Sequence, residues 1–226
     1  MDSYTKVIYP EDGANRYPAK LCCYLWDRFF NKKSSIKMLD IGCGKGTHLR
    51  EFSKLGMDCS GVDIRDEQTE FVVKVCNVGV DVLPYNDNSF DFVFSKSSIQ
   101  HIQDTDNLLK NVYRILKPGG VLVVLTPDWE SQYKFFWDDY THVKAFTRKS
   151  LRDAFKINGF FEVGCDYFYQ LPFLWGRDYL SFLPKVFSFF PDFLKWKTSE
   201  HRNTQDRKLI RFSKERMLLA YGKKGY

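Results

Sequence analysis

The chain has 226 residues, 44% of them apolar, which is enough for one sizeable hydrophobic core. No run approaches 18 uncharged apolar residues and the amino terminus lacks the apolar core of a signal peptide, so we expect neither a transmembrane helix nor secretion. Six cysteines show no C-x-x-C pair and no clustering with the four histidines, which predicts reduced thiols in a cytoplasmic protein without zinc or disulfides.

Strand and helix signals alternate along the chain after an irregular lead-in over residues 1–15. Apolar residues at helical spacing predict a first helix over residues 16–30, and within this amino-terminal segment Tyr9, Arg16 and Tyr17 could cover a ligand or pack in the core. Thr147 is a typical N-cap and Gly159 a typical stop for a later helix. The expected strands are 36–41, 58–63, 71–78, a fourth strand that ends before Ser95, 121–125, 160–168 and 215–221. Further helices are expected from 47, over 105–116 and over 147–158.

Three alternate glycines follow the first predicted strand, where residues 38–46 read Met-Leu-Asp-Ile-Gly-Cys-Gly-Lys-Gly. Gly42, Gly44 and Gly46 lack a Cβ, so the backbone can turn sharply and lie against a ligand. The helix that follows points its free N–H groups into the same crevice. Such a turn at the carboxyl end of a parallel strand is a place where open α/β sheets bind nucleotides.

The glycine spacing excludes two phosphate-binding motifs. A dinucleotide fingerprint, G-x-G-x-x-G, needs its third glycine one residue later, and a Walker loop needs Ser or Thr after Lys45, where Gly46 stands. What remains is Asp40 followed by Gly-x-Gly-x-Gly, which resembles motif I of the class I S-adenosylmethionine-dependent methyltransferases. Later segments follow in that family's order: Gly61-Val62-Asp63-Ile64, residues 71–78, Leu83-Pro84 with residues 88–93, residues 95–102, and Arg114 to Gly120.

This resemblance implies an α/β, Rossmann-like fold with a seven-stranded, mostly parallel sheet, helices on both faces and an antiparallel last strand. It also implies S-adenosylmethionine as the cofactor. Asp63 would hold the ribose hydroxyls, and either the Asn77 side chain or the Val78 N–H would read adenine. The family more often has Asp at the Asn77 position, and here two extra residues separate it from Leu83-Pro84. The expected cofactor contacts are Asp40, Gly42, Cys43, Gly44, Gly46, Asp63, Ile64, Asn77, Val78 and Ser95.

The loop after the fifth strand is the main indication of the acceptor. Residues 136–147, Phe-Trp-Asp-Asp-Tyr-Thr-His-Val-Lys-Ala-Phe-Thr, resemble a segment of methyltransferases associated with polysaccharide and glycan biosynthesis. A hydroxyl acceptor needs a base and a partner that orients it, and His142 with Asp139 supplies both residue types. The aromatic rings suit the apolar side of a sugar ring. His101, after the fourth strand, is a second candidate base or a packing residue.

The expected acceptor contacts in this loop are Trp137, Asp138 and Tyr140. The alternative is that His142 caps the next helix and that both acids are solvated. No metal is expected, because two carboxylates alone provide few of the ligands that Mg²⁺ or Ca²⁺ needs. After the fourth strand, Ser95-Lys96-Ser97-Ser98 replaces the Asn/Asp-Pro-Pro-aromatic sequence of nucleic-acid amino-group methylases, so a nucleic-acid partner is not expected.

An aromatic-rich insertion of about forty-five residues separates the last two predicted strands. Its prolines predict short helices, and residues 171–196 could form a cap, a dimer or membrane contact, or a wall of the acceptor pocket. Ten basic and three acidic residues lie between Lys195 and the last residue, although a solvated flank explains this charge without nucleic acid or lipid. We expect one domain: lead-in 1–35, cofactor core 36–168, insertion 169–212, and last strand with basic tail 213–226.

The sequence therefore predicts a methyltransferase that uses S-adenosylmethionine, with a sugar hydroxyl of a glycan or glycan precursor as the favoured acceptor. The alternatives are a methyltransferase of a small hydrophobic metabolite or lipid, such as a quinone, and a binding module without catalysis. The intact glycine turn with Asp63 argues against the last alternative. The oligomeric state and the methylated atom do not follow from the sequence.

Overall fold

The computed structural model describes residues 16–33, 35–66, 69–195 and 208–226. A seven-stranded sheet in the order β3-β2-β1-β4-β5-β7-β6 forms its centre. All pairs from β3 to β5 are parallel, whereas β7 is antiparallel to both β5 and β6. The predicted fold class, including the antiparallel last strand, is confirmed. The strands are β1 Lys37–Ile41, β2 Asp58–Asp63, β3 Val72–Val75, β4 Phe90–Lys96, β5 Leu116–Pro127, β6 Phe161–Phe168 and β7 Met217–Lys223.

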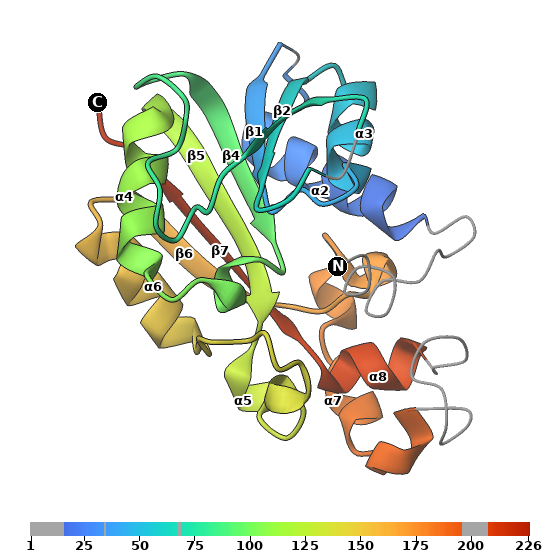
Figure 1. Cartoon of the computed structure of the whole chain (residues 1–226). Helices are drawn as coiled ribbons and strands as arrows, with labels where there is room; N and C mark the ends of the chain where they lie inside the picture. The colour runs from blue at the N-terminus through green and yellow to red at the C-terminus, as the bar shows by residue number, and fades with distance from the viewer. Residues whose placement is uncertain (1–15, 34, 67–68, 196–207) are drawn as a thin grey trace.

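Two helical layers cover the sheet (Figure 1). On one face, α2 and α3 bury Leu21, Leu25 and Phe52 against the Phe92 and Phe94 side of β4. On the other face, α4 and α6 pack on a second core around β5 and β7. The α-helices are α2 Tyr17–Phe30, α3 Thr47–Lys54, α4 Thr105–Ile115, α5 Trp129–Gln132, α6 Arg148–Ile157, α7 Leu183–Ser188 and α8 Lys208–Lys214.

Short 3-10 helices complete the connections, and they lie mainly in the insertion. Within it, η3 and η4 precede α7, and η5 and α8 follow, all of them short, as the prolines predicted for this segment. Their bounds are η1 Ile99–His101, η2 Phe136–Asp138, η3 Pro172–Leu174, η4 Asp178–Leu180 and η5 Asp192–Lys195. None of the described helices is long and apolar enough to cross a bilayer.

Several predicted boundaries needed correction. The third strand was expected over residues 71–78 but spans only Val72–Val75, because it is an edge strand that pairs with β2 alone. The fifth strand was expected from residue 121 but begins at Leu116, with a register shift where it pairs with the start of β4. The predicted Thr147 N-cap is confirmed: its side chain accepts a hydrogen bond from the Ser150 N–H in a capping box.

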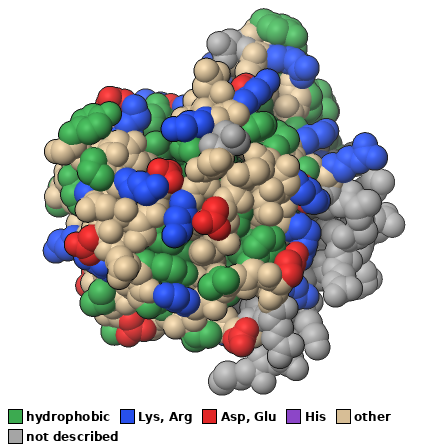
Figure 2. All heavy atoms as spheres, turned by 90° about the horizontal axis from the view of Figure 1, so that it is seen from above, with side chains coloured by type: hydrophobic (Ala, Val, Ile, Leu, Met, Phe, Trp, Pro, Cys, Tyr) green, Lys and Arg blue, Asp and Glu red, His purple; other side chains and the backbone are tan. Residues whose placement is uncertain are grey.

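The carboxyl ends of the parallel strands meet at one edge, together with the amino ends of α3, α4 and α6. This edge carries the loops in which the site residues were predicted. Figure 2 looks onto the opposite end, where the parallel strands begin, and basic and acidic side chains are interspersed there with hydrophobic groups. Tyr9 lies outside the described residues, as does the rest of the predicted lead-in before Arg16.

Candidate active site

The glycine turn after β1 is built for close approach of the backbone. Gly42, Gly44 and Gly46 all have positive φ, at 73°, 48° and 73°. A Cβ on Gly42 would lie 2.3 Å from Ser98 Oγ, so this glycine lets the turn pass the segment after β4. A Cβ on Gly44 would meet no atom within 4 Å. The turn is therefore tight against the protein at Gly42 and open at Gly44.

Asp63, at the end of β2, lies directly against this turn. Its Oδ2 accepts a hydrogen bond from the Gly44 N–H at 2.9 Å, and its Oδ1 accepts one from the Arg65 N–H at 3.2 Å. Ile64 beside it is 61% exposed. The structure thus brings three predicted cofactor residues, Gly44, Asp63 and Ile64, to one place. Carboxylate oxygens fixed by backbone N–H groups still have lone pairs for two ribose hydroxyls.

A buried polar cluster lies beneath the turn, on the face covered by α2 and α3. Asp40 is 2% exposed, and within the described part of the chain its Oδ2 and His48 Nε2 have no hydrogen-bond partner. Burial, and then the charge of Asp63, raise the pKa of Asp40 to about 8, against an opposing effect of Lys96. Burial and the nearby Lys96 lower the pKa of His48 to about 3. Buried polar atoms without partners mark a place for a polar ligand or water.

Lys96 and His48 were not among the predicted site residues. Phe92, Phe94 and Lys96 occupy alternate positions of β4 and therefore lie on the same face of the sheet. The Lys96 side chain thus enters the layer that holds Asp40 and His48. The His48 ring lies 5.3 Å from the Phe94 ring in this layer. Burial lowers the pKa of Lys96, and the charge of Asp40 opposes this effect. The strand alternation was the available signal in the sequence.

Tyr17 connects this cluster to the amino-terminal helix. Its ring lies 5.9 Å from Lys96 Nζ and packs edge-on against Trp175 of the insertion, with ring centroids 5.7 Å apart. Burial raises the pKa of its hydroxyl. The first described helix therefore reaches the cofactor edge through Tyr17, whereas Arg16 is its exposed N-cap residue.

Ser95 and Cys43 turn their side chains into the protein. The Ser95 hydroxyl is 1% exposed and donates to the Ile41 carbonyl at 3.1 Å, which ties β4 to β1. Cys43 is 6% exposed, and its Sγ fills the space beside Gly61, where a Cβ would lie 2.6 Å away. Contacts from these two residues to a cofactor would have to come from their backbone.

Asn77 forms a local turn after β3. Its Oδ1 accepts from the Gly79 N–H at 3.3 Å, and its own N–H donates to Asp81 Oδ2 at 2.9 Å. Val78 is buried at 9% exposure. Asp81, which was not predicted as a site residue, thus lies at the same turn as both adenine candidates. The predicted adenine contacts of Asn77 and Val78 are not tested by this arrangement.

On the acceptor side, the structure brings the three predicted catalytic residues together. Thr141 donates its hydroxyl to Asp139 Oδ1 at 2.6 Å, so its oxygen accepts from His101 Nδ1 at 2.9 Å. The His101 and His142 ring centroids are 4.8 Å apart. His101 follows β4 and the others follow β5, so this cluster forms only when the two loops meet. Thr141 was not predicted as a participant.

His142 is held in one tautomer by the backbone. Its Nδ1 lies 2.6 Å from the Phe136 carbonyl oxygen, which can only accept, so Nδ1 carries the proton. In the neutral ring Nε2 therefore has the lone pair; it lies 3.8 Å from Asp139 Oδ2, and only 11% of the side chain is exposed. This is the arrangement of a general base whose protonated form lies beside a carboxylate.

His101 has a different environment. Its Nδ1 donates to Thr141 and its Nε2 accepts from Gln100 Nε2 at 3.2 Å. Burial lowers the pKa of His101, and the charge of His142 lowers it further, against opposing effects of the Thr141 backbone and Asp139. Both ring nitrogens are thus engaged, and His101 is better placed to orient Thr141 and Asp139 than to take a proton first.

The three residues could also supply metal ligands. One nitrogen or carboxylate oxygen from each of His101, Asp139 and His142 lies within 4.8 Å of the others. Mg²⁺ and Ca²⁺ prefer oxygen ligands, so this nitrogen-rich set does not match the site for those ions that the sequence raised.

The predicted acceptor contacts lie on the surface around this cluster. Trp137 is 54% and Tyr140 is 87% exposed, and Asp138 is exposed as well. Phe136 is buried beneath them, with its ring 4.9 Å from that of Trp137 and 4.3 Å from that of His142. The loop thus offers open aromatic faces over a packed ring.

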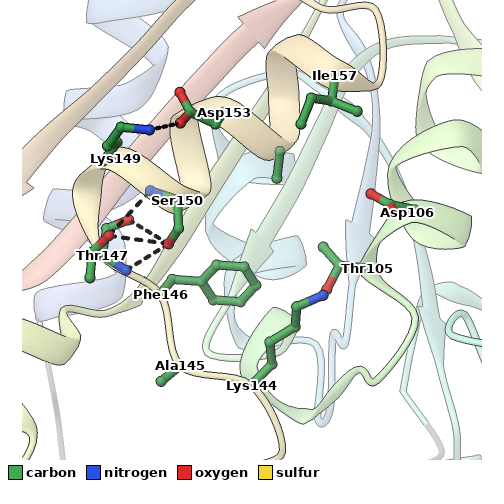
Figure 3. A pocket seen from close by; sticks show the side chains of 11 residues that line it. Thr105, Asp106, Lys144, Ala145, Phe146, Thr147, Lys149, Ser150, Asp153 and Ile157 are labelled. Atoms are coloured by element: carbon green, nitrogen blue, oxygen red, sulfur yellow. Dashed lines mark hydrogen bonds and ion pairs between the residues drawn. The ribbon is translucent and has the colours of Figure 1, made fainter.

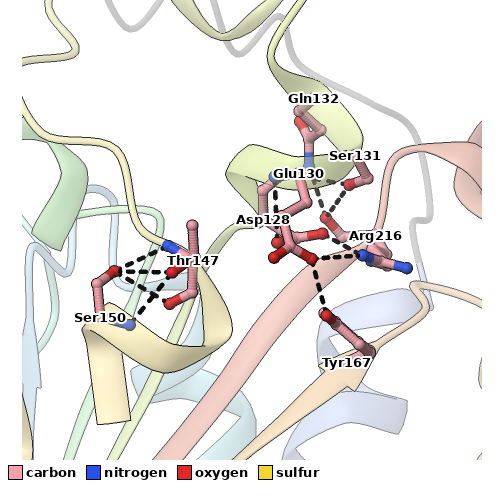
Figure 4. Close-up of polar contacts among 8 residues, drawn as sticks. All are labelled: Asp128, Glu130, Ser131, Gln132, Thr147, Ser150, Tyr167 and Arg216. Carbon is pink, nitrogen blue, oxygen red and sulfur yellow. Dashed lines mark hydrogen bonds and ion pairs between the residues drawn. The ribbon is translucent and has the colours of Figure 1, made fainter. Parts of the chain in front are cut away.

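Asp128 and Arg216 anchor this loop to the end of the insertion (Figure 4). Asp128 is fully buried, and its Oδ2 accepts from Arg216 Nε at 2.6 Å. The guanidinium group also lies 3.7 Å from the Tyr167 ring centroid, and Gln132 donates to the Arg216 carbonyl at 2.7 Å. Neither residue was predicted to have a role, because their contact spans 88 positions.

A hollow of about 470 Å³ lies beside the loop, between the amino end of α4 and the length of α6 (Figure 3). Its wall includes Lys144, Ala145 and Phe146, which directly follow the His142 segment. None of the predicted cofactor, catalytic or acceptor residues lines it. The residues that line it are Thr105, Asp106, Lys144, Ala145, Phe146, Thr147, Lys149, Ser150, Asp153, Ala154 and Ile157.

Comparison with known proteins identifies the family. A family model described as a methyltransferase domain matches residues 14–162, more than half of the chain. The chain belongs to the methyltransferase family. The glycine turn and Asp63 fit this family's cofactor, S-adenosylmethionine, because the space at Gly44 is open and polar atoms are buried just below it.

The names of two relatives of this chain refer to different acceptors. Phosphoethanolamine N-methyltransferase 2 of Caenorhabditis elegans is 32% identical over 143 residues, which cover 58% of this chain and 33% of the relative. Demethylmenaquinone methyltransferase of Lactobacillus johnsonii is 26% identical, with 70% of this chain and 83% of the relative covered. The chain thus spans about a third of the first of these relatives. Neither name refers to a glycan, so similarity to glycan methyltransferases remains a prediction.

Solved structures support the fold. A methyltransferase from Archaeoglobus fulgidus, described as dependent on S-adenosylmethionine, aligns with a TM-score of 0.64 at 21% identity and covers 93% of this chain and 95% of that chain. Phosphoethanolamine N-methyltransferase 2 of Haemonchus contortus, in complex with phosphomonomethylethanolamine and S-adenosylhomocysteine, aligns with a TM-score of 0.61 at 21% identity, over 91% of this chain and 52% of that chain.

Proposed function

We propose that the chain transfers a methyl group from S-adenosylmethionine to a hydroxyl group on a sugar of a glycan or glycan precursor, with His142 as the general base. The observation that carries the proposal is the fixed tautomer of His142, whose Nε2 lone pair faces Asp139 Oδ2 at 3.8 Å. The cofactor supplies the methyl group as a sulfonium electrophile, so the protein must align the acceptor and take up its proton.

Each residue of the cluster has a part in that proton transfer. His142 Nε2 accepts the proton of the acceptor hydroxyl, and the resulting imidazolium lies beside the Asp139 carboxylate. Thr141 holds Asp139 through two hydrogen bonds to Oδ1, one from its hydroxyl at 2.6 Å and one from its N–H at 3.0 Å. His101 fixes the Thr141 hydroxyl in turn. Such a base contributes about 10²–10⁴ in rate.

The aromatic surface supports a sugar as acceptor. Trp137 and Tyr140 expose their rings around the cluster, and ring faces pack well on the apolar side of a pyranose. Asp138, which is exposed next to them, could accept hydrogen bonds from further hydroxyl groups. These three residues are the proposed acceptor contacts.

A quinol-like acceptor is the second candidate. It is favoured by the length of the match to the demethylmenaquinone methyltransferase, which covers 83% of that relative. A flat aromatic acceptor would stack on the same exposed rings, and the same base would serve a phenolic hydroxyl. An amine acceptor, as in the name of the phosphoethanolamine relative, would also need a proton removed.

Acceptor screening with radiolabelled S-adenosylmethionine tests the proposal. Saccharides, quinols and phosphoethanolamine are offered separately to the wild-type chain and to His142→Ala. We expect label on a saccharide hydroxyl with wild type and a loss of about 10²–10⁴ in turnover with the variant. Label on the quinol alone would select the second candidate, and label on phosphoethanolamine alone would refute the hydroxyl acceptor.

A further inference from the structure

Helix α7 in the insertion turns an apolar face to the solvent. Phe182, Val186 and Phe189 are 54%, 50% and 88% exposed. The backbone is helical from one cap of α7 to the other, with φ and ψ of −75° and −26° at Phe182 and −74° and −18° at Phe189. Positions separated by four and seven residues lie on one face of a helix. The three side chains therefore form one outward surface.

The opposite face of α7 is already used for packing. Pro184 is buried, and Leu183 and Phe187 are half-buried; the Phe187 ring also stacks on that of Phe190 at 6.0 Å between centroids. The helix thus has two apolar faces, one packed inside the protein and one exposed. Exposed apolar surface of this kind marks a site of interaction.

The charge of the insertion points to the partner. Residues 169–212 contain eight Lys and Arg against four Asp and Glu, so this segment holds most of the net charge of +6. Lys185 is exposed on α7, three positions after Phe182 and thus on the same outward surface. A second copy of the chain would bring like charge to this surface. Anionic lipid instead attracts Lys and Arg while phenyl rings enter the interface between headgroups and acyl chains.

We propose that the outward surface of α7, formed by Phe182, Lys185, Val186 and Phe189, docks on an anionic membrane. In Figure 1, α7 and α8 lie beyond the carboxyl ends of the parallel strands, on the same side as α5 and the loop that follows it. Arg216, just after α8, is bonded to Asp128 at the start of that loop. Docking therefore holds the acceptor side of the molecule close to the lipid surface.

Vesicle co-sedimentation of the full chain tests this surface. Wild type is mixed with phosphatidylcholine vesicles and with vesicles that also contain phosphatidylglycerol. We expect binding to the mixed vesicles, weaker binding to phosphatidylcholine alone, and a decrease on addition of salt. Phe189→Ser should weaken binding about tenfold, and Lys185→Glu should weaken it on the mixed vesicles only.

Ile157→Ser is the matched control, because Ile157 is 80% exposed on α6 and remote from α7 in the sequence. It should bind vesicles as wild type does, and all variants should bind S-adenosylhomocysteine normally, which shows that they are folded. The proposal is overturned if wild type does not sediment with mixed vesicles, or if Ile157→Ser loses as much binding as Phe189→Ser. It is also overturned if light scattering shows a dimer that Phe189→Ser dissolves while vesicle binding is unchanged.

Discussion

The proposed cofactor half of the site, around the glycine turn, and the proposed acceptor half, around His142, are built by different kinds of contact. Around the glycine turn, the decisive contacts involve the backbone: Asp63 binds the Gly44 N–H, and Gly42 makes room for Ser98. In the acceptor half, side chains hold side chains, and His101 and Thr141 meet across 40 positions. Substitutions in the cofactor half should therefore lower the cofactor affinity, and substitutions in the acceptor half should lower turnover.

The largest expected effect separates the two halves at His142. His142→Ala removes the proposed base, so turnover should fall by about 10²–10⁴ while the affinity for S-adenosylhomocysteine, measured by calorimetry, stays unchanged. Asp138→Ala, in the same loop but exposed, should have a milder effect. Full turnover in His142→Ala would move the search for the base to His101, and a parallel loss of cofactor affinity would show that the halves are coupled.

Asp128→Ala should weaken the support of the acceptor half. The change leaves the Arg216 guanidinium without its buried carboxylate, and breaking such a pair costs about 3–5 kcal/mol. Because the Arg216 side chain is 24% exposed and water can screen it, we expect about 3 kcal/mol in the free energy of unfolding by urea. Glu130→Ala removes a half-exposed carboxylate from the same guanidinium and should cost about 1 kcal/mol or less. Equal losses in both variants would contradict this ranking.

Asp63→Ala tests the cofactor half. A carboxylate that accepts ribose hydroxyls contributes roughly 1.5–3 kcal/mol for each hydrogen bond, so the affinity for S-adenosylhomocysteine should fall about tenfold or more. Asp63→Asn keeps an acceptor oxygen for the Gly44 N–H and should lose less. Circular dichroism checks that both variants are folded. Unchanged affinity in folded Asp63→Ala would remove Asp63 from the site.

Lys96→Met tests whether the cofactor half also binds the amino-acid end of the cofactor. If Asp63 holds the ribose at the end of β2 and adenine lies toward β3, the methionine end of the cofactor would extend over β1 toward β4, where Asp40 and Lys96 lie. The ammonium group would then face the carboxylate of the cofactor. The variant should bind S-adenosylhomocysteine about tenfold more weakly but bind methylthioadenosine, which lacks the amino-acid group, as wild type does. Equal loss for both ligands would show that Lys96 supports the fold instead.

Much of the fold could be predicted because its signals are local. The glycine turn, the Thr147 cap and the short helices after Pro172 all depend on residue types within a few positions, and the structure has them where they were expected. The third strand was predicted too long because its apolar run continues into the Asn77 turn. Where the strand ends is decided by its pairing with β2.

The candidate site could be predicted in part. Asp63, His142 and Asp139 follow strands whose carboxyl ends must meet at one edge, so their proximity followed from topology. Thr141 and Arg216 could not be found in this way, because their roles depend on partners 40 and 88 positions away. Lys96 was missed although the alternation of β4 indicated its face, because lysine after an apolar strand more often reaches solvent.

The bond between Asp128 and Arg216 has a consequence for engineering the acceptor preference. It joins the first residue of the acceptor loop to the residue that leads from the insertion into β7. A chimera that receives residues 128–146 from a relative but keeps its own Arg216 would carry a mismatched anchor wherever the relative has a different acid. Loop and insertion are in this sense one exchangeable module in two pieces of sequence, and a transplant should take both.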